Sequence, residues 1–278
     1  MTVGIIGLGL IGGSLAKSIK EHSRHTVWGY DIDPTVVEKA LLVGAIDKEL
    51  SDDSLAQCDI VLVALYPSRC VEYITSHADK FAPHAMVIDC AGVKRSVYEP
   101  VAEVASRHPW TYIGGHPMAG REFSGFDHTN GTLFERASMI LTPMPDITVE
   151  ALTEAKGFFL DIGFRTVRIT TPEDHDNMIS FTSQLAHIVS SAYVKNPLSA
   201  QHKGFSAGSF QDMTRVARLN ENMWTELFLD NADNLSEELG CIIDNLQQYK
   251  DAIDEKDAPR LKELLAEGDR IKREVEGR

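Results

Sequence analysis

One short segment of the chain combines a histidine with residues that form tight turns. The segment IGGHPMAGREFSG, residues 113–125, contains His116, Pro117 and four glycines. So much glycine leaves little side-chain surface for a core, and Pro117 disfavours helical backbone at His116. A neutral imidazole can take a proton from an alcohol, so His116 is a candidate general base. The alternative is a loop histidine that hydrogen-bonds to the backbone, and these residues alone leave both interpretations open.

A second segment, GIIGLGLIGGSLA, has the spacing of a dinucleotide-binding loop, because Gly7, Gly9 and Gly12 lie between an apolar run and a helical pattern. The first glycine permits a tight turn, the second lets the backbone approach a pyrophosphate, and the third lets helix and strand pack closely. The helix amino terminus favours the negative charge of the phosphates. The expected cofactor-binding residues of this loop are Gly7, Gly9, Leu10, Ile11 and Gly12.

An acidic residue completes the nucleotide pattern. Asp31 ends the next apolar run, where a carboxylate can accept hydrogen bonds from the ribose hydroxyls of the adenosine. A carboxylate there repels a 2′-phosphate, so NAD is favoured over NADP. The alternative acid, Asp33, precedes Pro34 and is expected to cap the next helix. A sheet with glycine turns that binds no nucleotide, or binds another ligand, is the competing interpretation.

The elements that must position these residues alternate between strand and helix. Continuous β-branched runs at residues 3–7, 26–31, 59–65 and 85–90 are typical of parallel strands buried on both faces, and helical patterns lie between them. Further strands are expected within residues 110–115, 137–143 and 164–170. The sequence therefore predicts an α/β Rossmann-type, doubly wound, mostly parallel sheet. Ligands of such sheets bind at the carboxyl ends of the strands, so His116 can face the nicotinamide.

The pattern changes near Thr170, after which helical runs replace strands. Thr171 and Pro172 form a helix start. We predict a dinucleotide-binding domain over residues 1–170 and an all-helical substrate-binding and dimerisation domain over 171–278. The chain ends soon after the last helical run, so no appended regulatory domain is expected.

The first helix after this boundary carries an unusual polar stripe. At about 100° per residue, five polar side chains fall on one side, and no charged residue lies between Asp176 and Lys195. A solvated face would normally carry charges, so the stripe is expected to face a cleft or another helix. The alternative for its histidine is a buried, hydrogen-bonded side chain. His175 lies about 120° from His187 and is interpreted as a first-turn residue. The stripe consists of Asp176, Ser180, Ser183, His187 and Ser190.

Charge and composition exclude several classes of protein. The net charge of −14 argues against a nucleic-acid or anionic-membrane partner, although not against a small anionic substrate. The four cysteines fit no zinc motif and favour reduced thiols in a cytoplasmic protein, and no metal site is expected. The amino terminus lacks the basic region of a signal peptide, and the longest uncharged stretch is too polar for a membrane span.

Four segments together resemble the prephenate/arogenate dehydrogenase family over nearly the whole chain. GGHPMAGREFSG is similar to the family's His-Pro-Met-Ala-Gly-x-Glu signature, and GLGLIGGSLA with GYD is similar to its nucleotide site. HDNMISFTSQLAH resembles its Ser-His-Leu-Pro-His helix, and GSFQDMTRVARLNENMW resembles its substrate-arginine segment. Many dehydrogenases share the nucleotide motif, whereas the other three are far more specific.

The resemblance implies site residues at the matching positions. Ser183 and His187 would help to bind substrate, and Arg215 would grip a prephenate carboxylate, which suits a guanidinium that can form two parallel hydrogen bonds. The alternative for Arg215 is a surface ion pair, a role that suits Arg218 better. Glu122 matches the family's acid after the His-Pro segment, although an exposed loop glutamate is equally consistent. Trp224 falls at the family's tryptophan.

The chain departs from the family pattern at several positions. Gln184 and Ala186 replace the first histidine and the proline of the helical motif, and Gln211 replaces a basic residue four positions before the arginine. Gly92 replaces a serine that bonds the catalytic histidine or the reacting hydroxyl. The partner that orients His116 is therefore unidentified from the sequence.

The implied activity is NAD-dependent oxidative decarboxylation of prephenate to 4-hydroxyphenylpyruvate in tyrosine biosynthesis, with His116 as the base and no metal. Three alternatives remain: an arogenate dehydrogenase, another dinucleotide enzyme such as a 3-hydroxyacid dehydrogenase, and a non-catalytic NAD-binding protein. The uncharged central helix and the family's mode of pairing predict a homodimer through the helical domain.

Overall fold

Eight strands in the described part of the chain form a single sheet. The computed structural model describes residues 1–120 and 123–277. The strand order is β3-β2-β1-β4-β5-β6-β7-β8, and neighbouring strands run parallel except for β6 and β7. The strands are β1 (Thr2–Ile6), β2 (Thr26–Tyr30), β3 (Lys48–Glu49), β4 (Ile60–Val63), β5 (Met86–Asp89), β6 (Thr111–Pro117), β7 (Ser138–Pro143) and β8 (Thr166–Ile169).

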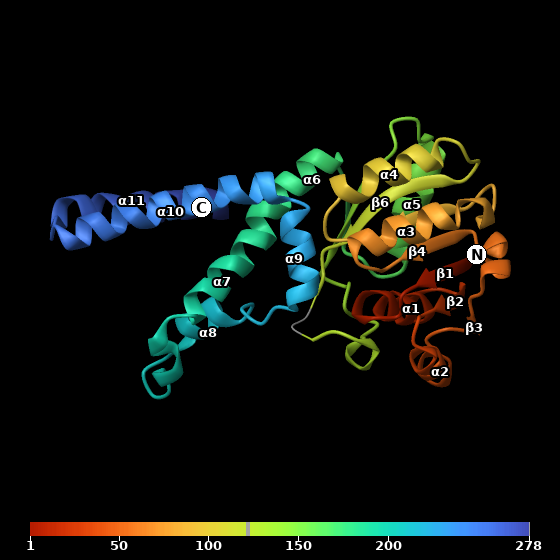
Figure 1. Cartoon of the computed structure of the whole chain (residues 1–278), viewed down its shortest axis with the longest axis horizontal. Helices are drawn as coiled ribbons and strands as arrows, with labels where there is room; N and C mark the ends of the chain where they lie inside the picture. The colour runs from red at the N-terminus through yellow and green to blue at the C-terminus, as the bar shows by residue number, and fades with distance from the viewer. Residues whose placement is uncertain (121–122, 278) are drawn as a thin grey trace. The chain divides into compact units, whose positions relative to one another are not determined.

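Helices cover both faces of this sheet, as expected for a doubly wound fold. The helices of this part are α1 (Leu10–His22), α2 (Pro34–Leu42), α3 (Pro67–Ser76), α4 (Arg95–Ala105) and α5 (Val149–Asp161). Apolar side chains of α1, α2 and α5 pack in one core, and those of α3 and α4 pack in another on the opposite face. Figure 1 shows α3 and α4 side by side over the sheet. The predicted fold class is confirmed.

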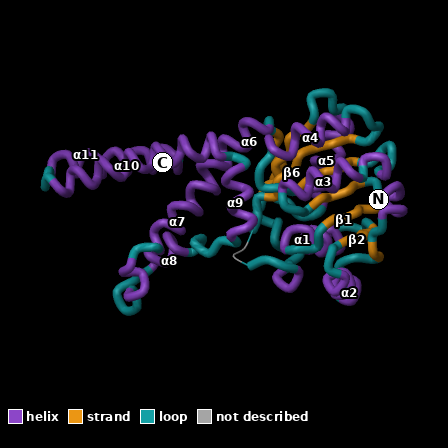
Figure 2. The backbone as a smooth tube through the Cα atoms, in the orientation of Figure 1, coloured by secondary structure: helices purple, strands orange, loops and turns teal. Residues whose placement is uncertain are grey.

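Only helices and loops follow β8 in the described residues, as the secondary-structure colouring of Figure 2 shows. The helices are α6 (Pro172–Ile179), α7 (Ala186–Val194), α8 (Gly208–Thr214), α9 (Glu221–Leu229), α10 (Ala232–Asp254) and α11 (Ala258–Glu276). A π-helical turn, Ser180–Leu185, joins α6 to α7. Such turns often occur at functional sites, because they change the direction in which side chains project.

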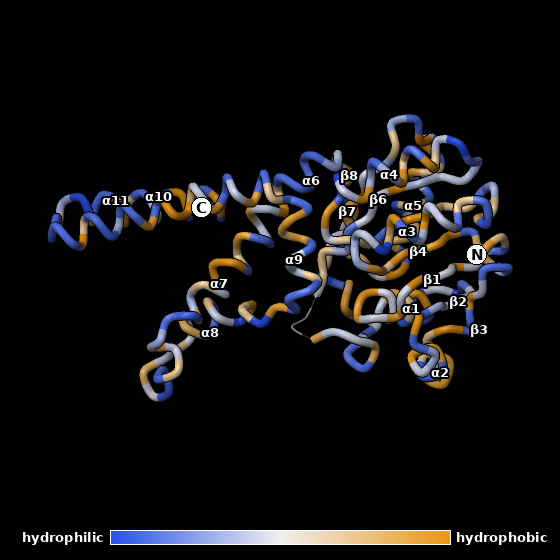
Figure 3. Tube along the Cα trace, viewed as in Figure 1, coloured by the Kyte–Doolittle hydropathy of each residue, from blue (hydrophilic) through white to orange (hydrophobic). Residues whose placement is uncertain are grey.

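The chain divides into two compact units, Met1–Asn231 and Ala232–Arg278. The second unit is a helix pair in which the Tyr249 hydroxyl donates to the Leu264 carbonyl at 3.1 Å. In Figure 3 the central strands of the sheet are coloured mainly as hydrophobic and α11 mainly as hydrophilic. All residues discussed below as site candidates belong to the first unit. The division of function between residues 1–170 and 171–278 stays a prediction.

Candidate active site

The turn from β1 into α1 has the geometry that its three glycines predict. Gly7 has a φ of +85°, and a Cβ there would lie 2.6 Å from the Ala64 carbonyl oxygen. A Cβ on Gly12 would lie 1.8 Å from the Gly7 carbonyl oxygen, so side chains are excluded at both positions. A Cβ on Gly9 would meet nothing within 4 Å. The loop therefore packs tightly against neighbouring backbone at Gly7 and Gly12 and is open at Gly9. A pyrophosphate that approaches the start of α1 requires this open side.

Asp31 lies beside this turn. Its carboxylate accepts hydrogen bonds from the Leu8 amide at 2.8 Å and from the Asp33 amide at 3.0 Å. The Gly7 amide donates to the Tyr30 carbonyl at 2.8 Å, which holds the end of β2 against the loop. Asp33 caps α2 by accepting from the Thr35 amide at 2.9 Å, as the sequence predicts. Leu10 and Ile11 form the first turn of α1. The predicted NAD-binding residues thus lie next to one another in space, and their arrangement fits a dinucleotide.

His116 lies at the carboxyl end of β6, where it pairs with Ile140 of β7. Its Nδ1 is 2.8 Å from Nε2 of His175, and Nδ1 of His175 is 2.7 Å from Oδ1 of Asp176. The His175 and Asp176 side chains are fully buried. The three residues form a continuous hydrogen-bonded series from α6 to the end of β6.

Asp176 is held by the amino terminus of α4. Its carboxylate accepts from the backbone amides of Lys94 at 2.7 Å and Arg95 at 2.9 Å. Burial acts to raise the pKa of Asp176, but the hydrogen bonds from His175 and from these amides outweigh it, so the pKa lies below its ordinary value. Asp176 is therefore ionised at neutral pH and can only accept hydrogen bonds.

A buried ion pair lies directly behind His116. The Lys94 ammonium pairs with the Asp89 carboxylate, and both side chains are fully buried. The same ammonium donates to the Gly115 carbonyl at 2.6 Å, and the Tyr112 hydroxyl donates to Asp89 at 2.8 Å. This pair fixes the backbone that carries His116.

The surroundings of His116 favour a neutral imidazole. Burial, then the neighbouring His175 and then Lys94 lower the pKa of His116 well below its ordinary value. Burial also lowers the pKa of His175, although its hydrogen bond to Asp176 opposes that effect. A buried imidazole loses its proton readily, because the charged form has lost the solvation of water. His116 is consequently available as a proton acceptor at neutral pH.

The glycine at the family's serine position lies near the Nε2 end of the His116 ring. A Cβ on Gly92 would lie 3.9 Å from Nε2 of His116 and 3.2 Å from Cδ2 of Leu227. No hydroxyl from this position can therefore orient the ring, and Leu227 of α9 covers Gly92. The hydrogen bond that the structure provides comes from His175, on the Nδ1 side.

A second cluster forms around α7 and α9. The His187 ring lies 4.1 Å from the Trp224 ring between centroids, and its Nδ1 is 2.8 Å from the Ser183 carbonyl oxygen. Burial and then the nearby charge of Arg215 lower the pKa of His187, although the Ser183 carbonyl opposes this. The structure thus places three of the four predicted substrate-binding residues near one another: Ser183, His187 and Arg215. Glu122, the fourth, lies outside the described residues.

A buried amide network explains one departure from the family pattern. Gln184 donates through Nε2 to the Leu227 carbonyl at 2.7 Å, and Asn231 donates to Gln184 Oε1 and to the Asp176 carbonyl, both at 2.8 Å. Arg95 donates to Asn231 Oδ1 at 2.9 Å. Gln184 therefore ties α9 to the π-helical turn, and the network braces Asp176.

Sequence reasoning missed the roles of His175, Gln184 and Asn231. The interpretation of His175 as a first-turn residue gave its position but not its function. The available signal was an adjacent His-Asp pair in a helix whose following residues carry no charge. A histidine next to a carboxylate in such a helix is a candidate for hydrogen bonding to a second buried group.

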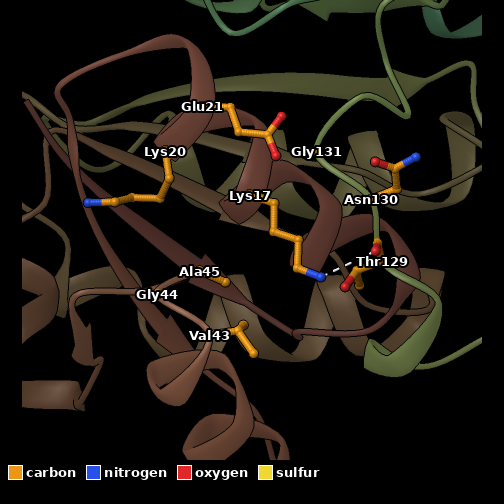
Figure 4. Close-up of a pocket in the computed structure, with 9 residues that line it drawn as sticks. All are labelled: Lys17, Lys20, Glu21, Val43, Gly44, Ala45, Thr129, Asn130 and Gly131. Atoms are coloured by element: carbon orange, nitrogen blue, oxygen red, sulfur yellow. Dashed lines mark hydrogen bonds between the residues drawn. The ribbon is translucent and has the colours of Figure 1, made fainter.

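One cavity lies away from these clusters. It has a volume of about 390 Å³ and lies between α1, residues 43–45 and residues 129–131 (Figure 4). Lys17 spans it to donate to the Thr129 carbonyl at 3.2 Å, and Lys20 pairs with Asp47 at 2.7 Å. None of the predicted site residues lines it, so it is not the candidate active site.

Neither a metal-binding cluster nor a membrane-spanning helix occurs among the described residues. Within residues 1–120 and 123–277, no three His, Cys, Asp or Glu side chains come together in a way that could hold a metal ion. None of the helices in the same ranges has the length and apolar character needed to cross a membrane.

Comparison with known proteins identifies two matching family models. The model described as "Prephenate dehydrogenase, nucleotide-binding domain" matches residues 15–168, and the one described as "Prephenate dehydrogenase, dimerization domain" matches residues 171–267. A cyclohexadienyl dehydrogenase of Zymomonas mobilis is 30% identical, over 97% of this chain and 94% of its own length.

Solved structures show the same similarity. Prephenate dehydrogenase from Aquifex aeolicus, in complex with hydroxyphenyl propionate and NAD+, is 28% identical with a TM-score of 0.85, over 99% of this chain and 98% of the other. Arogenate dehydrogenase from Synechocystis is 27% identical with a TM-score of 0.81, over 98% of this chain and 99% of the other.

Proposed function

The chain belongs to the prephenate dehydrogenase family, and on that premise we propose that it catalyses the NAD-dependent oxidative decarboxylation of prephenate to 4-hydroxyphenylpyruvate. The observation that carries the proposal is the half-buried His116 at the carboxyl end of β6, in the same sheet as the glycine loop, with its Nδ1 2.8 Å from Nε2 of His175 and its pKa lowered by burial. The relatives and solved structures that this chain matches include a prephenate, a cyclohexadienyl and an arogenate dehydrogenase.

The glycine loop and Asp31 would hold NAD, with the pyrophosphate at Gly9 and the ribose at the carboxylate. Bound NAD supplies the acceptor for the hydride that leaves the ring carbon bearing the hydroxyl. Nε2 of His116 takes the proton of that hydroxyl. The electron pair of the bond to the departing carboxylate enters the ring, which becomes aromatic as carbon dioxide leaves, and the resulting phenolate oxygen takes back the proton from Nε2 of His116 to give 4-hydroxyphenylpyruvate. The protein contributes mainly orientation and charge placement.

The cluster around Arg215 is suited to the carboxylates of the substrate. A guanidinium can bind a carboxylate through two parallel hydrogen bonds. The charge of Arg215 acts on His187, and the His187 and Trp224 rings, tilted by 34° to each other, offer aromatic surface to a six-membered ring. Leu227, on the same helix as Trp224, packs at Gly92 beside His116. The two clusters are therefore linked through α9.

Direct assay tests the proposal. Purified protein is incubated with prephenate and NAD, and NADH formation is followed by absorbance; the assay is repeated with arogenate and with NADP. We expect NADH formation with prephenate and little activity with NADP, because Asp31 repels a 2′-phosphate. Faster turnover of arogenate would reassign the substrate. No reduced cofactor with either compound would contradict the proposal in favour of a non-catalytic NAD-binding protein.

Replacing Arg215 by alanine should chiefly weaken substrate binding. Loss of a charge-assisted contact to a carboxylate costs about 1.5–3 kcal/mol, which corresponds to a roughly 10–100-fold rise in the KM for prephenate. The matched control is Arg218→Ala, which removes a neighbouring arginine that we expect to lie outside the site. Steady-state kinetics of both variants give the comparison. Equal KM values for the two variants would remove Arg215 from the proposed site.

We also propose that the chain forms a homodimer through its helical region, as the description of the family model that matches residues 171–267 suggests. Large apolar side chains in this region are exposed in the single chain, including Phe181 at 58% and Leu198 at 70%. Light scattering should give about twice the mass of one chain at micromolar concentration, because such exposed side chains favour association. A monomer at that concentration would contradict the dimer.

The four free cysteines favour a cytoplasmic location.

A further inference from the structure

Resting on the proposed role of His116 as the base, we propose that His175 and Asp176 are positioning residues that hold His116 in the tautomer with its proton on Nδ1. In this tautomer the lone pair of Nε2 is free to accept a proton. The inference rests on the series of contacts from Asp176 to His175 to His116, at 2.7 Å and 2.8 Å. It assigns the orienting partner that the glycine at position 92 cannot supply.

The position of each proton follows from what each group can donate. The Asp176 carboxylate has no proton, so Nδ1 of His175 must be the donor in their contact. A neutral imidazole has one donor and one acceptor nitrogen, which makes Nε2 of His175 the acceptor. Nδ1 of His116 must then carry a proton. The remaining nitrogen of His116, Nε2, has a lone pair, and it is the nitrogen that faces Gly92.

Burial protects the inner contact of this series from competing donors. His175 is 2% exposed and Asp176 is 0% exposed, so water has little access to the hydrogen bond between them. A charged His175 would donate from Nε2 to Nδ1 of His116 and so reverse the direction of that hydrogen bond. Burial lowers the pKa of His175 and thereby opposes the charged form. Two backbone amides at the start of α4 also neutralise much of the Asp176 charge without giving it a proton. Because Asp176 can only accept, His175 donates to Asp176 and His116 donates to His175.

The protein also restrains Asp176 through its main chain. Asn231 donates to the Asp176 carbonyl oxygen, and Gln184 and Arg95 hold the Asn231 amide group from both sides. The Asp176 backbone and carboxylate are thus held by different elements of the first compact unit. A carboxylate held so firmly can orient His175, and through it the His116 ring, without direct contact with the substrate.

Nuclear magnetic resonance can read the tautomer without substrate. Full-length protein is labelled with ¹⁵N-histidine, and the His116 signals are assigned by their loss in a His116→Asn variant. We expect the Nδ1 shift of His116 in the protonated range and the Nε2 shift in the unprotonated range at pH 7.5. A His116 protonated on Nε2 would overturn the proposal. This result does not depend on which substrate the enzyme uses, so it is separable from failure of the proposed function.

Kinetics of two His175 variants provide the second test. His175→Leu removes both contacts and should lower kcat roughly 10–100-fold, with little change in KM, because the ring of His116 loses its orientation. His175→Gln should retain kcat within a few-fold, since its amide oxygen can accept from His116 while its amide nitrogen donates to Asp176. A merely structural role would not alter the His116 tautomer. Equal kcat values for the two variants, both being folded, would contradict the proposal. If the leucine variant does not fold, the tautomer measured in the unmodified protein still decides it.

Discussion

Replacing His116 by asparagine should reduce kcat by roughly 10²–10⁴-fold, the usual contribution of a positioned general base. Asparagine is the informative change, because its amide can occupy the position of Nδ1 and keep a contact with His175 while providing nothing at the position of Nε2. The KM for prephenate should change little, since the substrate carboxylates are assigned to the Arg215 cluster. Steady-state rates of NADH formation, with protein concentrations matched, give the measurement.

A surface histidine provides the control for this substitution. His84 is exposed, and its Nε2 lies 3.4 Å from the Asp59 carboxylate, away from the candidate site, so His84→Asn should leave kcat unchanged. The pH profile of the unmodified enzyme adds a further check, because a base must be neutral to act. Since burial holds the pKa of His116 well below its ordinary value, the acid fall in kcat/KM should lie below pH 6.5. A His116→Asn variant with kcat within tenfold of the unmodified enzyme would exclude His116 as the base.

The sequence was sufficient to predict the sheet, because its strands are continuous apolar runs. Val3–Ile6 and Ile60–Val63 are buried along their whole length, as parallel strands covered on both faces must be. Every run predicted as a strand overlaps an observed one, although β1 begins one residue earlier and β6 ends two residues later than predicted. The two-residue strand β3 was not predicted, since two charged residues form no recognisable pattern. The antiparallel pairing of β7 with β6 was also not predicted, because the run at residues 137–143 does not alternate between apolar and polar residues as a half-exposed antiparallel strand would.

The site was predictable where the chemistry resides in one short segment. The glycine loop is local, so spacing alone indicates its turn, its close packing and its open side. His116 was predicted as the base from its neighbours in the chain and from the resemblance, and that role stays a prediction. Its partner was not predicted, because His175 lies 59 positions away and reaches His116 only through the tertiary fold. The side-chain arithmetic for the helix also assumed uniform α-helical geometry, which the π-helical turn Ser180–Leu185 interrupts.

A departure from a family motif has a physical meaning only when its surroundings are known. In the sequence, Gly92 leaves His116 without an orienting group, whereas in the structure His175 contacts the ring on its Nδ1 side. In the sequence, Gln184 replaces a histidine of the family motif, whereas in the structure its buried amide joins Leu227 to Asn231. In each case the compensating contact comes from an element distant in the sequence.

Replacing Lys94 by methionine should have the largest effect on stability. The two side chains are similar in length, so the change leaves no large cavity, but it leaves the Asp89 carboxylate buried without its ammonium partner. Removing one partner of a buried ion pair costs about 3–5 kcal/mol in the free energy of unfolding. Urea denaturation at one fixed protein concentration measures the loss, because the stability of a dimer depends on concentration.

The same substitution in an exposed ion pair separates the effect of burial from that of charge. Lys39 and Asp127 form a pair at 2.9 Å with side chains 52% and 71% exposed, so Lys39→Met should cost no more than about 1 kcal/mol. Lys94→Met should also reduce turnover, because the ammonium that holds the Gly115 carbonyl fixes the backbone of His116. If the two variants unfold at the same urea concentration, Lys94 cannot be what holds the end of β6. The rigidity of His116 would then have to come from His175 and Asp176 alone.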